Sequence, residues 1–270
     1  MFYKLGENSP LVEVFGVKKP SSEAREADYC FDEGVFETMR TVQGALWNWR
    51  AHSERLVASA RVFKVDIAKQ HLKDLKRKID MMLKGREGES RVRLQVSREG
   101  VVNVGVHEFH EFDEQKRREG VVVSIYPFER RNPTVKYIDP ATRLLARSLF
   151  EEEGVEDVLW EDPKTGALTE GSMSNFGMVK DGVLVVPPEG TCLEGTSLLR
   201  LIEAAEQEGI EVRRAAISRL DLATADEAWI SSVSKDVVPV RSVVGVRDFE
   251  VSDSGVVSRL MRKMMAEREL

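Results

Sequence analysis

The sequence predicts a mixed α/β protein built from two halves. Helical and extended patterns alternate along its 270 residues, a length that suits one large domain or two of ordinary size. The densely charged stretch HEFHEFDEQKRRE, at residues 107–119, separates one run of such patterns from the next. We therefore expect a small N-terminal domain over residues 1–112 and a larger C-terminal domain over residues 120–270.

Strand and helix signals of the first half follow one another closely. They predict two extended runs around Gln43-Gly44 within residues 35–49, helices at about residues 52–63 and 66–84, and a strand at residues 91–97. The helices follow from apolar residues that recur at helical spacing, and the last strand from strict alternation in RVRLQVS. Small-molecule sites favour clefts between halves of this kind.

The second half restarts with a strand pattern and continues in the same mixed style. Its first part predicts a strand at GVVVSIYPF, a helix over 140–153, a strand at DVLW and a hairpin that turns at Asp181-Gly182. A helix capped by Thr196 or Ser197 and ending near Gln207 is expected next. A short helix from Ser218, a strand at EAWIS and an amphipathic C-terminal helix complete the prediction. Capping residues, Pro140 and the glycines that follow the helices support these boundaries.

Composition excludes several classes of function. The formal net charge of −6 gives no electrostatic reason to expect nucleic-acid binding. No apolar run approaches the length of a membrane span or a signal peptide, so we expect neither a membrane partner nor export. The two cysteines, Cys30 and Cys192, lack zinc spacing and favour a cytoplasmic location. His107 and His110 lie on an extended segment, so we expect no metal site.

Six segments of the chain match one enzyme family in the order in which that family has them. They are VFETMR (35–40), RAHSERLVASA (50–60), VKYIDPATRLLARSLFEEEG (135–154), LTEGSMSNFGMVKDGVLVVPP (168–188), LEGTSLLRLI (193–202) and ADEAWISSVSKDVVPV (225–240). Together they resemble the fold type IV enzymes that use pyridoxal 5'-phosphate (PLP), a class IV aminotransferase family that includes branched-chain and D-amino acid aminotransferases and 4-amino-4-deoxychorismate lyases. The resemblance implies a two-domain α/β (α+β) architecture with the cofactor between the domains.

The resemblance assigns the catalytic lysine to Lys136, in the larger predicted domain. In the family, the lysine that forms the Schiff base with PLP precedes a helix that ends in a glycine eighteen positions later. Gly154 stands eighteen positions after Lys136. No other lysine occurs between Lys116 and Lys164, so this register is unambiguous.

A glutamate and its neighbours are expected at the pyridine ring of the cofactor. Glu170 matches the family glutamate that bonds the pyridine nitrogen and keeps it protonated, so that the ring can accept electrons. Ser174 and Asn175 follow closely in the sequence, and the resemblance places them in the cofactor site as well.

The resemblance implies a composite binding site for the cofactor phosphate. Arg55 matches the family's phosphate arginine in an H-x-x-R-L context, and arginine suits phosphate because its planar group makes paired charge-assisted bonds. The start of a predicted helix is expected to supply backbone amides, which favour anions. The other expected phosphate ligands are Gly195, Thr196, Ser197, Ser232, Val233 and Ser234.

The substrate side of the pocket departs from the family pattern. Asp139 and Pro140 stand where the family often has an asparagine after the lysine, and the Arg-x-His pair of one aminotransferase type is missing. Phe36 and Thr38 match the family's first segment, and Arg98 is the nearby cation. We expect these three residues in the substrate pocket.

Three functions remain open at this stage. The first is an aminotransferase acting through Lys136 on a small amino acid and a keto acid. The second is a 4-amino-4-deoxychorismate lyase that releases pyruvate and 4-aminobenzoate with the same lysine; Thr38 favours it because the lyases have a functional threonine there. The third is a PLP-binding protein without turnover, which the intact Lys136, Glu170 and Arg55 disfavour. The resemblance also implies a homodimer.

Overall fold

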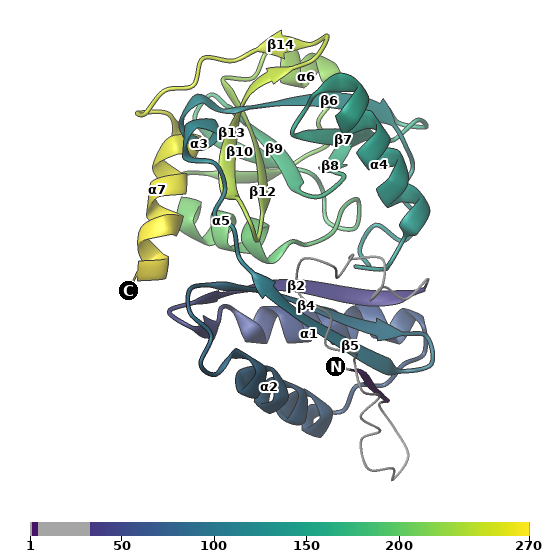
Figure 1. Cartoon of the computed structure of the whole chain (residues 1–270). Coiled ribbons are helices and arrows are strands. Elements are labelled where there is room, and N and C mark those ends of the chain that lie inside the picture. The colour runs from purple at the N-terminus through teal and green to yellow at the C-terminus, as the bar shows by residue number, and fades with distance from the viewer. Residues whose placement is uncertain (1, 5–32, 270) are drawn as a thin grey trace. The chain divides into compact units, whose positions relative to one another are not determined.

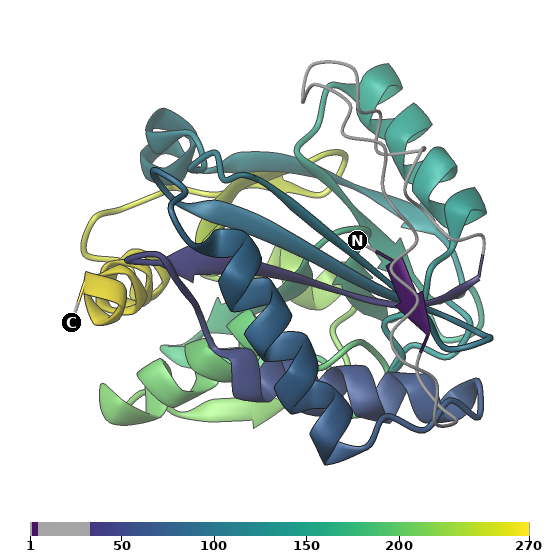
Figure 2. The same cartoon turned by 60° about the horizontal axis from the view of Figure 1, so that its bottom comes forward.

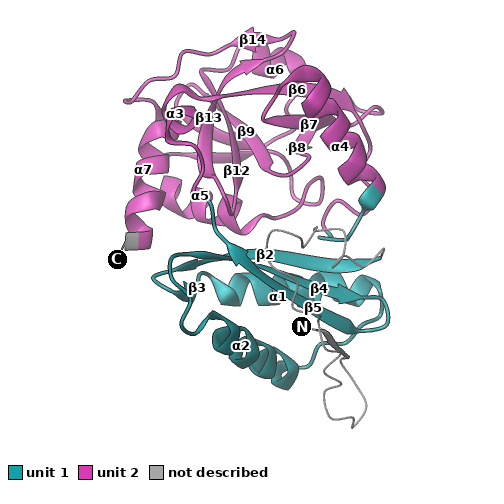
Figure 3. Cartoon of the chain, in the orientation of Figure 1, with its two compact units in different colours: residues 1–110, 135–140 teal, residues 111–134, 141–270 magenta. Residues whose placement is uncertain are grey.

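The computed structural model describes residues 2–4 and 33–269 and divides the chain into two compact units (Figure 3). Unit 1 comprises residues 1–110 and 135–140, and unit 2 comprises residues 111–134 and 141–270. This division differs from the predicted one in the segment 135–140. That segment contains Lys136 and packs with unit 1, whereas we had placed the lysine in the larger C-terminal domain. Cys30 lies outside the described residues.

Unit 1 contains a five-stranded antiparallel sheet in the order β1-β5-β4-β2-β3 (Figure 1). Its strands are β1 (Phe2–Lys4), β2 (Gly34–Val42), β3 (Ala45–Leu46), β4 (Ser90–Ser97) and β5 (Val101–Glu108). Gln43 and Gly44 form the two-residue turn between β2 and β3 with positive φ angles of 52° and 76°. Such a left-handed pair suits a tight hairpin, as the sequence predicted.

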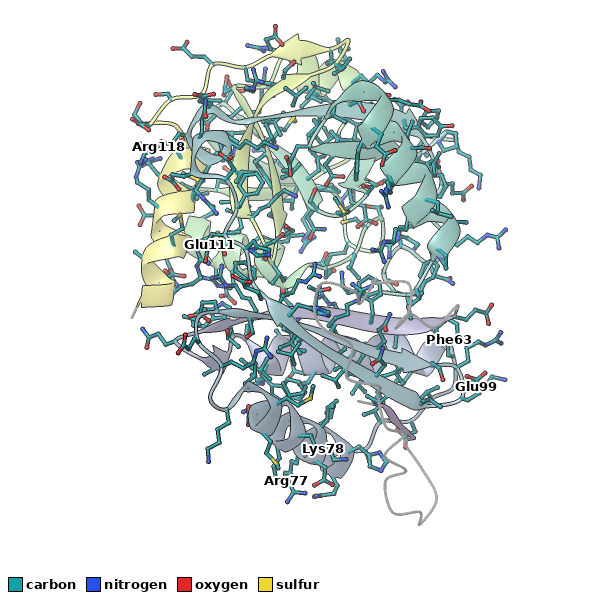
Figure 4. All side chains as sticks on the ribbon, viewed as in Figure 1. Phe63, Arg77, Lys78, Glu99, Glu111 and Arg118 are labelled. Atoms are coloured by element: carbon teal, nitrogen blue, oxygen red, sulfur yellow. The ribbon has the colours of Figure 1, made fainter. Side chains whose placement is uncertain are left out.

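Two helices, α1 (Trp49–Val62) and α2 (Lys69–Leu83), pack on the sheet of unit 1 (Figure 2). Leu56 and Ile79 are fully buried with Val92 and Leu94 of β4 in one hydrophobic core. The opposite surface of α2 is charged, and Figure 4 shows Arg77 on its outer side. Both helices were predicted, but α1 begins three residues earlier and α2 three residues later, because apolar spacing marks the buried face rather than the ends.

Unit 2 is built on a nine-stranded mixed sheet in the order β11-β10-β9-β12-β13-β6-β7-β8, with β14 paired to β13. Its strands are β6 (Val121–Pro127), β7 (Asp157–Glu161), β8 (Leu168–Gly171), β9 (Asn175–Lys180), β10 (Val183–Val186), β11 (Val212–Arg214), β12 (Glu227–Ser232), β13 (Asp236–Val243) and β14 (Arg247–Asp248). The pairs β6–β7, β6–β13 and β10–β11 are parallel, and the other pairs are antiparallel.

Five helices belong to unit 2, and three of them cover parts of the sheet. They are α3 (Glu114–Glu119), α4 (Pro140–Glu153), α5 (Thr196–Gln207), α6 (Arg219–Ala223) and α7 (Val256–Glu269). Leu198 of α5 and Leu260 of α7 are fully buried in one core with Trp229 of β12. Leu149 of α4 packs in a separate core with Trp160 of β7.

Most predicted elements of unit 2 are present. The helix α4 has the predicted bounds, and Asp181 and Gly182 form the hairpin turn between β9 and β10 with φ angles of 52° and 76°. The prediction that Thr196 or Ser197 caps α5 is wrong. The N-cap is Gly195 and no side chain caps this helix, so both residues lie in its first turn.

Two negative findings apply to the part of the chain that the structure describes. None of its helices combines the length and the hydrophobicity needed to cross a membrane. Within the same part, no group of three or more histidine, cysteine, aspartate or glutamate side chains is arranged to hold a metal ion.

Candidate active site

Lys136 is fixed to strand β2 by its backbone. The Phe36 N–H donates to the Lys136 carbonyl at 3.0 Å, and the Ile138 N–H donates to the Gly34 carbonyl at 2.8 Å. On its other side, the Lys136 N–H donates to Ser59 Oγ of α1 at 3.1 Å. The segment 135–140 therefore continues the sheet beyond β2, with Lys136 opposite Phe36.

Two cations approach the Phe36 ring. Lys136 Nζ lies 4.7 Å from the ring centre, and Arg93 Cζ lies 3.6 Å from it. Arg93 Nη1 also donates to Thr38 Oγ1 at 2.9 Å. The structure thus brings two predicted pocket residues, Phe36 and Thr38, together with the predicted catalytic lysine and with an arginine that the sequence did not single out.

The register of the sheet explains this grouping. Thr38 lies opposite Arg93, Phe36 opposite Gln95, and Gln95 opposite Asn103, so these side chains share one face. Gln95 and Asn103 are nearly completely buried, and Asn103 Nδ2 donates to Gln95 Oε1 at 3.0 Å. Along the described strands β2, β4 and β5 this face carries no acidic residue, so it suits an anionic ligand.

Arg98 does not join this group. It lies in the turn between β4 and β5, where Arg98 Nη1 pairs with Glu33 Oε2 at 2.6 Å. Its side chain is 56% exposed. The structure therefore does not bring Arg98 together with Phe36 and Thr38, although the sequence grouped the three.

Arg55 is oriented by a buried carboxylate. Arg55 Nε and Nη2 donate to the two oxygens of Glu37 at 2.8 and 2.7 Å, which is a bidentate contact between α1 and β2. His52 Nδ1 lies 2.8 Å from Glu37 Oε2, and the Glu37 side chain is completely buried. These three side chains form a charged cluster that sets the direction of the Arg55 guanidinium.

Electrostatics keep Glu37 ionised. Burial opposes its charge, but the charge of Arg55 and the hydrogen bonds from Arg55 and His52 outweigh burial and lower the pKa of Glu37 to about 2. Burial also lowers the pKa of His52, although its hydrogen bond to Glu37 acts in the other direction. The cluster therefore holds one anion and one permanent cation at neutral pH, with a neutral imidazole beside them.

In unit 2, Glu170 is held by an arginine and a backbone amide. Arg130 Nη1 donates to Glu170 Oε1 at 2.6 Å, and the Leu193 N–H donates to Oε2 at 3.3 Å. The Glu170 side chain is 7% exposed and that of Arg130 is 17% exposed. The guanidinium balances the buried charge of the carboxylate, so Glu170 can remain an anion at the end of β8.

Asn175 joins Glu170 to the start of α5. Asn175 Nδ2 donates to the Leu193 carbonyl at 2.6 Å, next to the amide that contacts Glu170. A Cβ atom on Gly195 would lie only 1.8 Å from Asn175 Oδ1, so the N-cap of α5 must be glycine for this close approach. Asn175 also lies opposite Ser231 in the β9–β12 pair, just before the predicted phosphate residues 232–234.

The remaining predicted cofactor residues fall into two groups. Thr196 and Ser197 are buried in the first turn of α5, while Ser232, Val233 and Ser234 lie where β12 ends and turns toward β13. The hydroxyls of Ser232 and Ser234 are 3.2 Å apart. Ser174 behaves differently, because its hydroxyl donates to Asp157 Oδ2 at 2.6 Å and thereby supports the loop after Glu170.

The donors near Gly195 fit a phosphate group. A helix start without a side-chain cap presents backbone amides and the positive end of the helix dipole. The buried Ser231 hydroxyl has no hydrogen-bond partner among the described residues, and it lies in the strand next to Asn175. The carboxylate of Glu170 supplies the acceptor that a protonated pyridine nitrogen requires.

Cys192 is close to this group but is not suited to react. Burial, together with the charges of Glu170 and Glu194, raises the pKa of its thiol to about 12. The side chain is 1% exposed and belongs to the hydrophobic core. It is therefore a packed thiol, as the sequence suggested.

Sequence reasoning missed three polar residues of these groups. Glu37 was noticed only as part of the segment VFETMR. Arg93 could have been found, because the alternation in RVRLQVS places it on the face opposite Val92 and Leu94. No local signal identifies Arg130, because its contact with Glu170 spans forty positions.

Comparison with known proteins identifies the family of this chain. The family model for amino-transferase class IV matches residues 34–243. A putative branched-chain-amino-acid aminotransferase of Methanocaldococcus jannaschii is 29% identical over an alignment of length 240 that covers 80% of each chain. A D-alanine aminotransferase of Listeria monocytogenes is 26% identical over an alignment of length 261 that covers 88% of each chain.

Solved structures show the same fold. A putative branched-chain amino acid aminotransferase from Thermotoga maritima superposes with a TM-score of 0.81 at 23% identity, covering 99% of this chain and 95% of that one. A putative 4-amino-4-deoxychorismate lyase from Legionella pneumophila gives a TM-score of 0.74 at 17% identity, covering 89% and 95%. With the family model matching most of its length, the chain belongs to the class IV aminotransferases and is a PLP-dependent transaminase of the fold type IV architecture.

Proposed function

We propose that this transaminase exchanges the amino group between small amino acids and 2-oxo acids, with Lys136 as the residue that carries PLP. The observation that supports it best is the register that sets Lys136 opposite Phe36, with its amine 4.7 Å from the ring centre. The two aminotransferases reported above, which act on branched-chain amino acids and on D-alanine by name, favour a small amino acid.

The residues of unit 1 suggest how the substrate is held. Arg93, stacked on Phe36 and hydrogen-bonded to Thr38, is the cation that we propose for the substrate carboxylate. The Lys136 amine then accepts the proton from the α-carbon of the amino acid. In the reverse half-reaction it donates a proton to the α-carbon of the 2-oxo acid that receives the amino group. When bound, PLP supplies the electron-accepting ring that makes this proton acidic.

The residues that we propose for the cofactor divide by charge. Glu170 bonds the pyridine nitrogen, and its pairing with Arg130 supports an anionic carboxylate in that role. Arg55, directed by Glu37, contributes to phosphate binding. The first turn of α5 and the residues Ser232 to Ser234 contribute amides and hydroxyls for the same group.

A substrate panel with two arginine variants tests this proposal. The protein is incubated with pyruvate and a series of L- and D-amino acids, and keto-acid formation is followed. Arg93→Leu should raise KM by about 10- to 100-fold, because a charge-assisted hydrogen bond to the carboxylate is lost. Arg98→Leu removes an exposed arginine of the same strand pair and should leave KM unchanged. Equal effects of the two changes would contradict the role of Arg93.

The alternative function is 4-amino-4-deoxychorismate lyase activity, which uses the same lysine and releases pyruvate. Thr38 favours it, because the lyases that the chain resembles have a functional threonine at this position. The Thr38 hydroxyl lies on the same face as Phe36 and accepts a hydrogen bond from Arg93. Incubation with aminodeoxychorismate, followed by detection of pyruvate and 4-aminobenzoate, separates the two activities. Pyruvate release without any amino transfer in the panel would favour the lyase.

We further propose that the enzyme is a cytoplasmic homodimer. The family resemblance supports the dimer, and exposed apolar side chains such as Leu144 of α4, which is 68% exposed, offer apolar surface. Trp49 and Phe63 do not add to this surface, because both pack against the core of unit 1. The buried thiol of Cys192 is compatible with a reducing compartment.

A further inference from the structure

We propose that Asp236 is a positioning residue that ties together the two phosphate-binding arms of unit 2, an inference that rests on the proposed function of those arms. The first arm is the start of α5 at Gly195, Thr196 and Ser197. The second is the turn at Ser232 to Ser234. Asp236 stands two positions after Ser234 and begins β13.

Asp236 has a backbone conformation that few residues adopt. Its φ angle is 57°, which is the left-handed region, and the residue is 2% exposed. Asp236 pairs with Ser232 at the closed end of the β12–β13 hairpin, so this conformation shapes the turn that carries the second arm. Aspartate and asparagine tolerate left-handed backbone better than other side chains with a Cβ atom.

Two arginines from different helices form ion pairs with the Asp236 carboxylate. Arg268 Nη2 of α7 lies 2.8 Å from Oδ2, and Arg200 Nη1 of α5 lies 3.6 Å from Oδ1. Arg200 stands one helical turn after Thr196, so Asp236 connects the second arm to the helix that begins with the first. All three side chains are at most 13% exposed.

The neighbouring residue is restrained as well. Arg117 Nη1 of α3 donates to the Lys235 carbonyl at 2.8 Å, and Lys235 Nζ pairs with Glu156 Oε1 at 3.2 Å. The turn is therefore anchored through its last two residues, whereas the Ser232 and Ser234 hydroxyls remain on its exposed side. Buried ion pairs contribute little net stability, so a network of this kind is better explained by the position that it imposes.

The tie should matter for the phosphate of PLP and for nothing else on the cofactor. With Asp236 neutral, the turn loses its ion pairs with Arg200 and Arg268. The distance between the phosphate-binding groups of the first arm and those of the second is then no longer fixed. Pyridoxal, which lacks the phosphate, makes no use of that spacing. A loss confined to PLP therefore distinguishes positioning from a general loss of structure.

The experiment compares the affinities of the cofactor-free full-length protein for PLP and for pyridoxal by calorimetric titration. Asp236→Asn keeps the shape and tolerates the left-handed backbone, and it should weaken PLP by roughly 3- to 30-fold while pyridoxal changes less than twofold. Arg268→Gln should act in the same direction and serves if Asp236→Asn fails to fold. Asp181→Asn is the matched control, because Asp181 is an exposed left-handed aspartate in the β9–β10 turn.

Each outcome bears on one claim. A selective loss of PLP affinity in Asp236→Asn or Arg268→Gln, but not in Asp181→Asn, supports the tie. Equal losses of affinity for both ligands, or unchanged affinities, overturn the positioning role of Asp236. If the wild-type protein still prefers PLP to pyridoxal, the proposed phosphate-binding role of the two arms is unaffected by that result. A wild-type protein that binds pyridoxal as tightly as PLP overturns the phosphate arms themselves, and the inference with them.

Discussion

At the scale of single residues, the carboxylate of Glu170 is buried, and both of its oxygens accept hydrogen bonds. Arg130 contacts one oxygen and the Leu193 amide contacts the other. A carboxylate held in this way can stay ionised next to a pyridine nitrogen and keep that nitrogen protonated. The arginine therefore belongs to the proposed function of the glutamate, although it need not touch the cofactor.

We predict that Glu170→Gln still binds PLP but slows amino transfer by two or more orders of magnitude, roughly the contribution of a positioned acid or base. A neutral amide does not hold the pyridinium proton. Single-turnover absorbance measurements with a saturating amino acid give the rate. Gln115→Leu, on the exposed side of α3, is a control. A rate near that of the wild type would show that another group protonates the ring.

The arginines show where reading single residues reached its limit. Arg98 was chosen because it follows a predicted strand, yet it pairs with Glu33 in an exposed turn. Arg93 lies five positions earlier, and the alternation of the same strand contained the information that places it beside Phe36. The alternation within a strand predicts which face of the sheet a side chain lies on. It does not predict that Arg93 contacts the Phe36 ring and the Thr38 hydroxyl on that face.

At the scale of elements, the Glu37–His52–Arg55 cluster joins β2 to α1. Because the pKa of Glu37 is lowered to about 2 from 4.5, its ionised form stabilises the folded state fully above about pH 4.5. That stabilisation decreases as the pH falls from 4.5 toward 2, since the unfolded chain takes up the proton first.

We predict that Glu37→Gln lowers the free energy of unfolding by about 3 kcal/mol at neutral pH, because it leaves Arg55 with an uncompensated buried charge. The difference from the wild type should shrink as the pH falls from about 4.5 toward 2, because Glu37 of the unfolded wild type is protonated in this range while Glu37 of the folded protein becomes neutral only near pH 2. Urea denaturation across this range measures it. Glu54→Gln, in an exposed pair with Arg50, should show no such dependence. A difference that stays constant down to pH 2 would contradict the lowered pKa.

The elements also show why some strands could not be predicted. Strand β13 contains Pro239, which cannot donate a ladder hydrogen bond and argues against a strand inside a sheet. The structure accommodates it because β6 pairs with β13 only from Val240 onward. Helices α4 and α7 were predictable, since their apolar spacing reflects burial that is local in sequence.

At the scale of the whole molecule, the alternation of strands and helices predicted the fold class and two parts of the chain, but not where residues 135–140 belong. Their packing with unit 1 depends on the hydrogen bonds from the Phe36 N–H to the Lys136 carbonyl and from the Ile138 N–H to the Gly34 carbonyl, which join residues about a hundred positions apart. Pairing across such distances leaves no local signal. The family register identified the lysine without showing which strand holds it.

Assembly gives a prediction at the same scale. The proposed homodimer should sediment as one species of about twice the 30.5 kDa chain mass at micromolar concentration. An interface of this kind should bury more than roughly 1,000 Å². A charged substitution of an exposed apolar residue, Leu144→Glu, tests whether α4 lies in it, with Leu220→Glu as the matched control. A fully active species of 30.5 kDa would contradict the dimer.

The most direct test of the account is to locate the lysine that carries PLP. Borohydride reduction of the wild-type protein with PLP should fix the cofactor covalently, and mass spectrometry of the peptides should find it on Lys136. Lys136→Ala should lose both the modification and turnover. Replacement of Lys164, the next lysine in the sequence and an exposed partner of Glu129, should change neither. Modification of a different lysine in the wild type, or an active Lys136→Ala enzyme, would contradict the assignment.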